Sequence, residues 1–127
     1  VFRASTGKQL HKFVSSKVDP RDSDFGYSVA ISGDLAVVGA RHDRDTLDGN
    51  AAGIAYIFNT ATKEELHKVA RPGLSVEDEF GFSVAISGDT VVVGAASFNR
   101  RKGGVWSIAT GLAPSGAQGD PIILGLN

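Results

Sequence analysis

Apolar and small polar residues alternate in two stretches of the chain that are nearly identical. Residues 25–34 read FGYSVAISGD and residues 80–89 read FGFSVAISGD, so nine of the ten positions agree. A period of two is typical of a β-strand on a half-buried sheet. Each stretch ends in Ser-Gly-Asp, where the glycine suits a tight hairpin turn.

An uninterrupted apolar run follows each of these turns. The runs are residues 35–40 and 90–95, and both end in Val-Val-Gly-Ala. Such runs are typical of strands covered on both faces. Recurrence at an offset of 55 residues predicts stacked modules that cannot bury their apolar faces alone. The expected strands are, in order, 27–32, 35–40, 53–58, 64–70, 82–87, 90–95 and 104–108, with 122–124 as a short additional strand.

The repeated motif resembles the FG-GAP repeat. The resemblance rests on Phe-Gly before a hydrophobic strand, on Val-Val-Gly-Ala at 37–40 and on Gly-x-Ala-Tyr-Ile-Phe at 53–58, and it covers residues 1–110. In that family each repeat forms one four-stranded blade of a β-propeller, as in the head of integrin α chains. The resemblance therefore implies an all-β fold of antiparallel propeller blades, a partial propeller, and a secreted or cell-surface protein.

The resemblance also divides the chain into three parts. Residues 1–24 correspond to the end of a preceding blade and a linker, because Val1-Phe2 aligns with Ile57-Phe58. Within them, a fourth, outer strand is expected near residues 8–14. Residues 25–79 form a complete blade, and residues 80–127 form a second blade with an irregular C-terminal tail.

The resemblance raises the question of whether the chain has a calcium site. Integrin-type repeats carry an Asp-x-Asp-x-Asp-Gly loop between the first two strands, but here that place holds only Ser-Gly-Asp, at 32–34 and 87–89. Three residues cannot supply the six or more oxygens that calcium takes. We therefore expect no cofactor and no metal at these turns.

An acidic loop at residues 41–50 is the remaining candidate for an ion. Asp43, Asp45 and Asp48 can supply oxygens, but their spacing misses the calcium pattern by one residue. Two arginines in the same loop, Arg41 and Arg44, oppose a cation. A solvated hairpin loop is the alternative interpretation.

Composition narrows the classes of function. The net charge of −1 implies no attraction to nucleic acid or to anionic lipid, and the absence of cysteine excludes disulfides and thiolate chemistry. No apolar run approaches the roughly 20 residues that span a bilayer, so no membrane insertion is expected.

No catalytic constellation is predicted. Gly26-Tyr27-Ser28-Val29-Ala30 resembles a nucleophile elbow, but it starts a strand and recurs at residues 81–85, so a structural role is favoured. His11 and His67 occupy matching positions of separate repeats, and His42 lies in the acidic loop; none has the clustered ligands of a metal site. We expect that the chain is not an enzyme.

Two classes of function remain. The first is a non-catalytic structural or protein-interaction module, whose partner is another protein or the remaining blades of a propeller. Arg100, Arg101 and Lys102 form a basic loop that can contact an acidic partner, although charge runs are usually solvated. The second is an accessory or carbohydrate-binding segment of a larger secreted enzyme or lectin.

The repeats also make a prediction about packing. We expect a buried interface between adjacent blades, and we expect the chain to belong to a larger propeller or assembly, because repeat units need neighbours to bury a continuous core. The residues predicted for this interface are Val29, Ile31, Val37, Val38, Val84, Ile86, Val92 and Val93.

Overall fold

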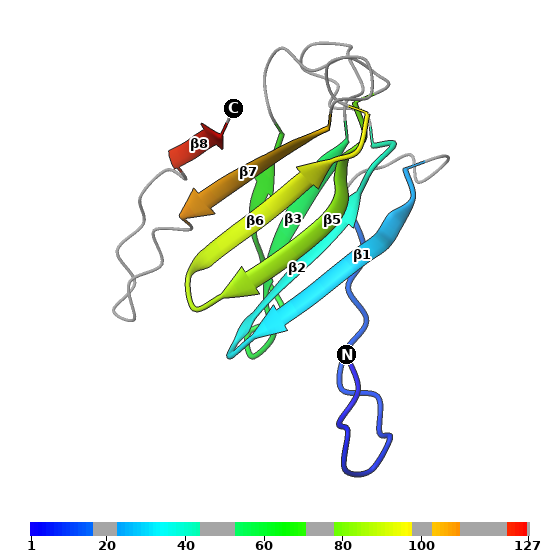
Figure 1. Ribbon diagram of the computed structural model, residues 1–127. Coiled ribbons are helices and arrows are strands. Elements are labelled where there is room, and N and C mark those ends of the chain that lie inside the picture. Colours follow the sequence, from blue (N-terminus) through cyan, green and yellow to red (C-terminus); the bar gives the residue numbers. More distant parts are fainter. Residues whose placement is uncertain (17–22, 44–52, 71–77, 98–102, 110–121, 127) are drawn as a thin grey trace.

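The chain folds into two four-stranded antiparallel sheets that lie face to face (Figure 1). The computed structural model describes residues 1–16, 23–43, 53–70, 78–97, 103–109 and 122–126, and these contain no helix. Each sheet follows the order of the sequence, β1-β2-β3-β4 and β5-β6-β7-β8. The strands are β1 (Phe25–Ser32), β2 (Leu35–Ala40), β3 (Ile54–Asn59), β4 (Glu65–Val69), β5 (Phe80–Ser87), β6 (Thr90–Ala95), β7 (Gly104–Ala109) and β8 (Ile122–Leu126).

The two sheets begin with the same hairpin because their sequences are the same there. In the first sheet Ser32 pairs with Leu35 across a two-residue turn, and Gly33 supplies a φ of 54°. In the second sheet Ser87 pairs with Thr90, and Gly88 has a φ of 57°. A positive φ at the first turn position is what such hairpins require, so the alternating pattern correctly predicted both turns.

The Phe-Gly pair makes a bulge at the start of β1 and of β5. The register shifts between Phe25 and Ser28, and again between Phe80 and Ser83. The glycines, Gly26 and Gly81, have φ values of 95° and 90°, a conformation that residues with a Cβ rarely adopt. This is the structural reason that glycine follows phenylalanine in both repeats.

The main core lies between the two sheets. Side chains alternate across a strand, so each sheet has two faces, and one face of the first sheet meets one face of the second. We call these the rear face of the first blade and the front face of the second. The buried members of this core are Val37, Ala55, Ile57, Val69, Phe80, Val91, Val93, Ala95 and Ile108.

The sheets approach most closely at two glycines. A Cβ on Gly39 would lie 2.1 Å from the backbone oxygen of Gly81, and one on Gly53 would lie 1.9 Å from that of Phe80. Ser28 fixes the same contact, because its hydroxyl donates a hydrogen bond of 2.8 Å to the Gly81 oxygen. Small residues at these positions therefore set the spacing of the sheets.

A second, smaller cluster lies on the front face of the first blade. It consists of Val38, Ala40, Ile54, Tyr56 and Phe58. Part of the N-terminal segment covers it, since the ring of Phe13 stacks on that of Phe58 with centroids 4.5 Å apart.

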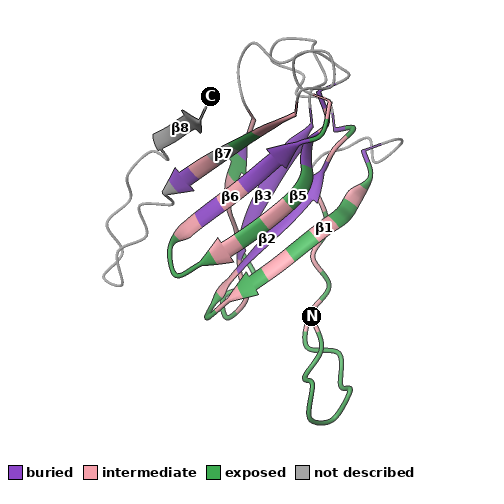
Figure 2. Cartoon of the chain, viewed as in Figure 1, coloured by how far each residue is buried: buried purple, intermediate pink, exposed green. Residues whose placement is uncertain are grey.

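The predicted all-β blade fold is confirmed, but two local predictions are wrong. Residues 8–14 form no strand; the N-terminal segment has only an isolated bridge between Phe2 and Gln9. Val29 and Ile31 were expected in the interface, yet they are 68% and 59% exposed. Figure 2 shows the contrast between the largely uncovered β1 and the buried β2 beside it.

The other interface predictions have mixed outcomes. Val37 and Val93 belong to the core between the sheets, and Val84 and Ile86 pack against it. Val38 is buried in the smaller cluster instead, while Val92 is half-buried and belongs to neither. Sequence periodicity identified apolar strands but could not say which face of each strand meets the other sheet.

Candidate functional site at the blade junction

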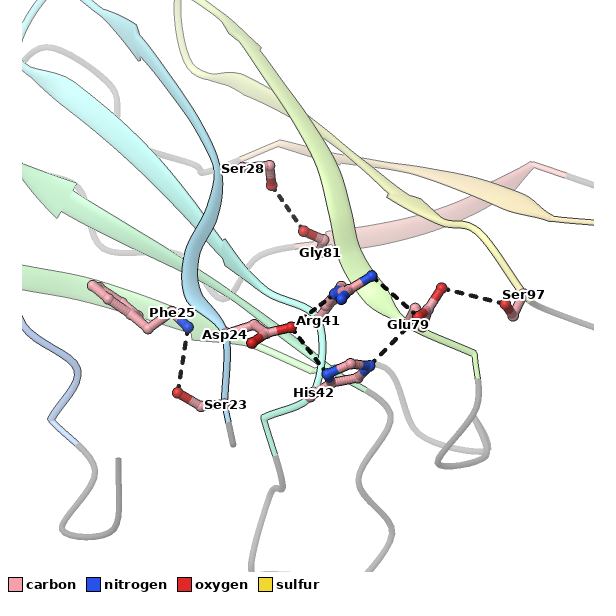
Figure 3. A network of polar contacts seen from close by, with 9 residues as sticks. All are labelled: Ser23, Asp24, Phe25, Ser28, Arg41, His42, Glu79, Gly81 and Ser97. Carbon is pink, nitrogen blue, oxygen red and sulfur yellow. Dashed lines mark hydrogen bonds and ion pairs between the residues drawn. The ribbon is translucent and has the colours of Figure 1, made fainter. Parts of the chain in front are cut away.

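A network of charged side chains joins the two blades at the ends of β2 and β5 (Figure 3). Asp24 and Glu79 each precede a Phe-Gly pair, and both have a positive φ, 51° and 56°. Arg41 follows the last residue of β2 and reaches both carboxylates. Its Nε donates to Asp24 Oδ2 at 2.9 Å, and its Nη1 lies 3.4 Å from Glu79 Oε1.

His42, like Arg41, contacts the carboxylates of both Asp24 and Glu79. Its Nδ1 is 3.0 Å from Asp24 Oδ2, and its Nε2 is 3.4 Å from Glu79 Oε1. From the second blade, the hydroxyl of Ser97 donates to Glu79 Oε2 at 3.3 Å. The network therefore links one acidic residue of each repeat through two basic side chains of the first.

Two aromatic rings flank the guanidinium of Arg41. Its Cζ lies 4.0 Å from the centroid of the Tyr27 ring and 5.9 Å from that of Phe82. Tyr27 and Phe82 occupy the same position of the two repeats and contact each other, with centroids 5.2 Å apart. Cation–π contacts of this kind are worth about 0.5–1 kcal/mol at exposed sites.

The network shifts the pKa values of two of its members, Asp24 and Arg41. The hydrogen bond from Arg41 lowers the pKa of Asp24, and the charge of His42 acts in the same direction. The bond to Asp24 raises the pKa of Arg41. Both groups therefore stay charged, and since the network is partly exposed, salt weakens it.

Asp43, one of the predicted calcium ligands, has a structural role. It is buried, and its Oδ2 accepts a hydrogen bond of 2.5 Å from the hydroxyl of Tyr56. That hydroxyl also accepts a bond from Ser15 at 3.2 Å. Burial, and then the bond to Asp43, raises the pKa of Tyr56 well above its usual range.

The other candidate ligands do not join Asp43 within the part of the chain that the structure describes. Asp45 and Asp48 lie outside the described residues. No group of three or more potential ligands that could hold a metal occurs among the described side chains. The calcium hypothesis for this loop therefore gains no support from Asp43, whose oxygen is already engaged.

The remaining candidate residues make other contacts or lie outside the described residues. Arg100, Arg101 and Lys102 lie outside the described residues, between Ser97 and Gly103. Ser28, the residue of the apparent nucleophile elbow, donates its hydroxyl to a backbone oxygen of the opposite blade. His11 makes an edge contact with the ring of Phe13, and His67 lies on β4.

Sequence reasoning did not identify the junction network, although the sequence contains a signal for it. An acidic residue stands directly before Phe-Gly in both repeats, at positions 24 and 79. Arg41 carries no such signal, because the equivalent position of the second repeat is Ala96. Its role depends on the contact between blades, which a single repeat does not reveal.

Two successive four-stranded antiparallel sheets, stacked through apolar faces and built from one repeat, define blades of a β-propeller-type protein. The model of the FG-GAP repeat matches residues 8–58 and 67–106, which is more than half of the chain. The chain belongs to the FG-GAP repeat family. No curated protein matches the sequence. None of the described segments forms a helix that is long and apolar enough to cross a membrane.

Proposed function

We propose that the chain is a non-catalytic structural and protein-interaction module of the FG-GAP β-propeller type, and that it works within a larger propeller or assembly. The observation that supports this proposal most is the exposure of apolar side chains on β1. Val29 and Ile31 present apolar side chains to solvent, although the same residues of the second repeat are covered by the first blade. Exposed apolar faces of this kind mark interaction surfaces.

A non-catalytic role agrees with how the polar side chains are used. In the described residues, Ser28 and the charged residues Asp24, Arg41 and Glu79 connect one blade to the other. Asp43 is held by Tyr56 inside the first blade. These groups stabilise the fold, and the family to which the chain belongs is generally a structural or interaction module.

Partner binding through loops is part of the proposal. The loop that starts after Asp43 and the loop that starts after Ser97 both begin near Glu79, because Arg41, His42 and Ser97 all reach its carboxylate. Loops on a rigid scaffold often carry binding functions. The basic residues Arg100, Arg101 and Lys102 follow Ser97 in the sequence, outside the described residues, and they make an acidic protein segment the favoured partner of the second loop.

The module's dependence on neighbours can be tested with residues 1–127 alone. We expect sedimentation velocity to show association or aggregation that added flanking repeats or a partner relieve. A monodisperse monomer that unfolds cooperatively in urea would contradict the proposal.

The basic loop can be tested separately with a fluorescent hexaglutamate peptide. Binding should weaken with salt and disappear in the triple variant R100E, R101E, K102E. The control is a triple reversal at Lys8, Lys63 and Lys68, which are exposed elsewhere. Equal loss of binding in both variants would show that only net charge matters.

An accessory carbohydrate-binding segment is the second candidate, and a secreted or cell-surface location is proposed with either, because FG-GAP repeats typically occur in extracellular proteins. A glycan array distinguishes the two candidates. Selective binding of one glycan class by the chain would favour the carbohydrate-binding role.

A further inference from the structure

The front face of the first blade is uncovered where β1 runs along it. Val29 and Ile31 point to this face, since Val29 pairs with Val38 of the front cluster and Ile31 with Ala36. They are 68% and 59% exposed. Next to them is a groove of about 700 Å³, which β1, β2 and the N-terminal segment line.

The same face of the second blade is filled. Val84 and Ile86 are the residues of β5 that correspond to Val29 and Ile31, at an offset of 55. Both are half-buried, and they pack against the core that the rear face of the first blade provides. Identical side chains thus differ in exposure only because one pair has a blade in front of it.

The glycines of the two bulges show the same difference. Gly26 and Gly81 share a backbone conformation, with φ values of 95° and 90°. A Cβ on Gly81 would lie 2.7 Å from the backbone oxygen of Ile54 in the first blade, whereas one on Gly26 would meet nothing within 4 Å. The seat on the first blade therefore already has the shape of the seat that is filled.

The N-terminal segment occupies one edge of this seat. By the alignment of residues 1–12 with 57–68, Phe13 corresponds to Val69 of β4, and by its place on the third strand Phe58 corresponds to Ile108 of β7. Val69 and Ile108 share the core between the blades. The stacking of Phe13 on Phe58 reproduces that relation, so residues 1–16 lie where the outer edge of another blade belongs.

From these correspondences we infer that the groove is the seat for the three inner strands of a further FG-GAP repeat, to which residues 1–16 add the outer edge. This inference rests on the proposed function and names its partner. The partner repeat lies against the first blade as the first blade lies against the second. Its rear face contributes small and apolar side chains at the positions of Ala30, Val37 and Gly39.

The existing junction also specifies the polar chemistry of the partner. Across it, Ser28 donates to the backbone oxygen of Gly81, and Arg41 reaches Glu79 while lying over Phe82. The corresponding groups on the free seat are Gly26, Asp24 and Tyr27. The partner repeat therefore supplies a hydroxyl to the Gly26 oxygen, whereas Arg41 of this chain already binds Asp24 and lies over Tyr27.

A second copy of this chain fits the seat less well. Its free rear face is that of the second blade, which keeps Ser83 and Gly94 but has Ala96 at the position of Arg41. It therefore lacks the guanidinium that joins the first blade to the second. Its β8 would also compete with residues 1–16, because β8 is the outer strand of that blade. A repeat that resembles the first blade is the better occupant.

The test rebuilds the missing strands from the chain itself. A duplicate of residues 25–56 is fused directly before Val1, which is the residue that aligns with Ile57, so the fusion encodes one more blade with its own serine, glycine and arginine. Because the chain has no cysteine, Ile31→Cys gives a single thiol in the seat. We expect maleimide to label this thiol at least about tenfold more slowly in the fusion than in residues 1–127, since protection follows burial.

Three controls make the result specific. Lys63→Cys, which is exposed in the first blade, should react equally fast in both proteins. Ile86→Cys, in the filled seat, should react slowly in both if they are folded. In a matched fusion, Gly39→Arg in the duplicate alone should restore fast labelling at Ile31→Cys, because its side chain would collide with the seat.

Two outcomes would overturn the inference. One is fast labelling of Ile31→Cys in a fusion that still protects Ile86→Cys. The other is protection in residues 1–127 that rises with protein concentration, which would make a second copy the occupant. Either result leaves the proposed function standing if residues 1–127 still depend on neighbours, whereas a stable, isolated monomer counts against that function itself.

Discussion

Replacing Val37 by alanine tests whether the blades are held together by the core between them. Val37 is fully buried at the centre of the rear face, where it pairs with Ala30 and Ile57. The substitution removes two methyl groups, which at about 0.8 kcal/mol each gives about 1.6 kcal/mol of lost transfer energy. The surrounding cavity adds to this, so we expect a loss of about 2–3 kcal/mol.

The matched control is Val105→Ala on β7. Val105 is 48% exposed on the far side of the second blade, so the same substitution changes strand propensity but leaves no cavity, and it should cost under about 1 kcal/mol. Both variants are measured by urea titration of the chain extended by residues 25–56, followed by fluorescence of the single tryptophan. At a slope of about 2 kcal/mol per molar urea, Val37→Ala lowers the midpoint by about 1 M. Equal midpoints for the two variants would refute the assignment of this core.

Three other perturbations follow from the structure. Gly39→Ala should destabilise the extended chain more than Gly94→Ala, because the new Cβ of the former meets a backbone oxygen and that of the latter meets the movable hydroxyl of Ser83; equal midpoints in urea would contradict this. The lowered pKa of Asp24 stabilises the fold fully above its ordinary value of 3.8, and this contribution is lost as the pH falls through the folded pKa. Acid unfolding of Asp24→Asn should therefore be less steep below about pH 4, and an unchanged pH profile would argue against the Arg41 contact. Calorimetry should detect no micromolar calcium binding at the Ser-Gly-Asp turns, and binding that Asp34→Ala or Asp89→Ala removes would overturn this expectation.

Much of the fold could be predicted from the sequence because the repeat is both local and duplicated. Alternation in residues 27–32 and the glycine at 33 define a hairpin without reference to the rest of the chain. The exposure of Val29 could not be predicted in the same way. It depends on whether another blade stands in front of β1, and the residue itself is the same in both repeats.

The site was harder to predict than the fold for a related reason. Acidic residues in a loop suggested an ion-binding site. The buried carboxylate of Asp43 instead accepts a hydrogen bond from the hydroxyl of Tyr56, a residue of β3 that lies 13 positions later in the sequence. Arg41 appeared only as a charge that opposes calcium, whereas it connects two blades and lies over two rings. Such roles arise from packing between units, which the pattern within one unit does not encode.

The positions at which the two repeats differ show how the rear faces of the two blades differ in chemistry. Serine, glycine and valine recur at the contact positions of both rear faces, so the two blades have the same backbone geometry there. Four changes set the second rear face apart: Arg41 becomes Ala96, His42 becomes Ser97, Ala55 becomes Val105, and Ile57 becomes Ser107. The rear face of the second blade therefore carries fewer charges than that of the first. A further blade that docks on this second rear face would meet no guanidinium at position 96, so it needs no acidic residue before its Phe-Gly pair. In the larger propeller that we propose, the junctions are alike in backbone and distinct in charge, and that difference favours one order of blades over another.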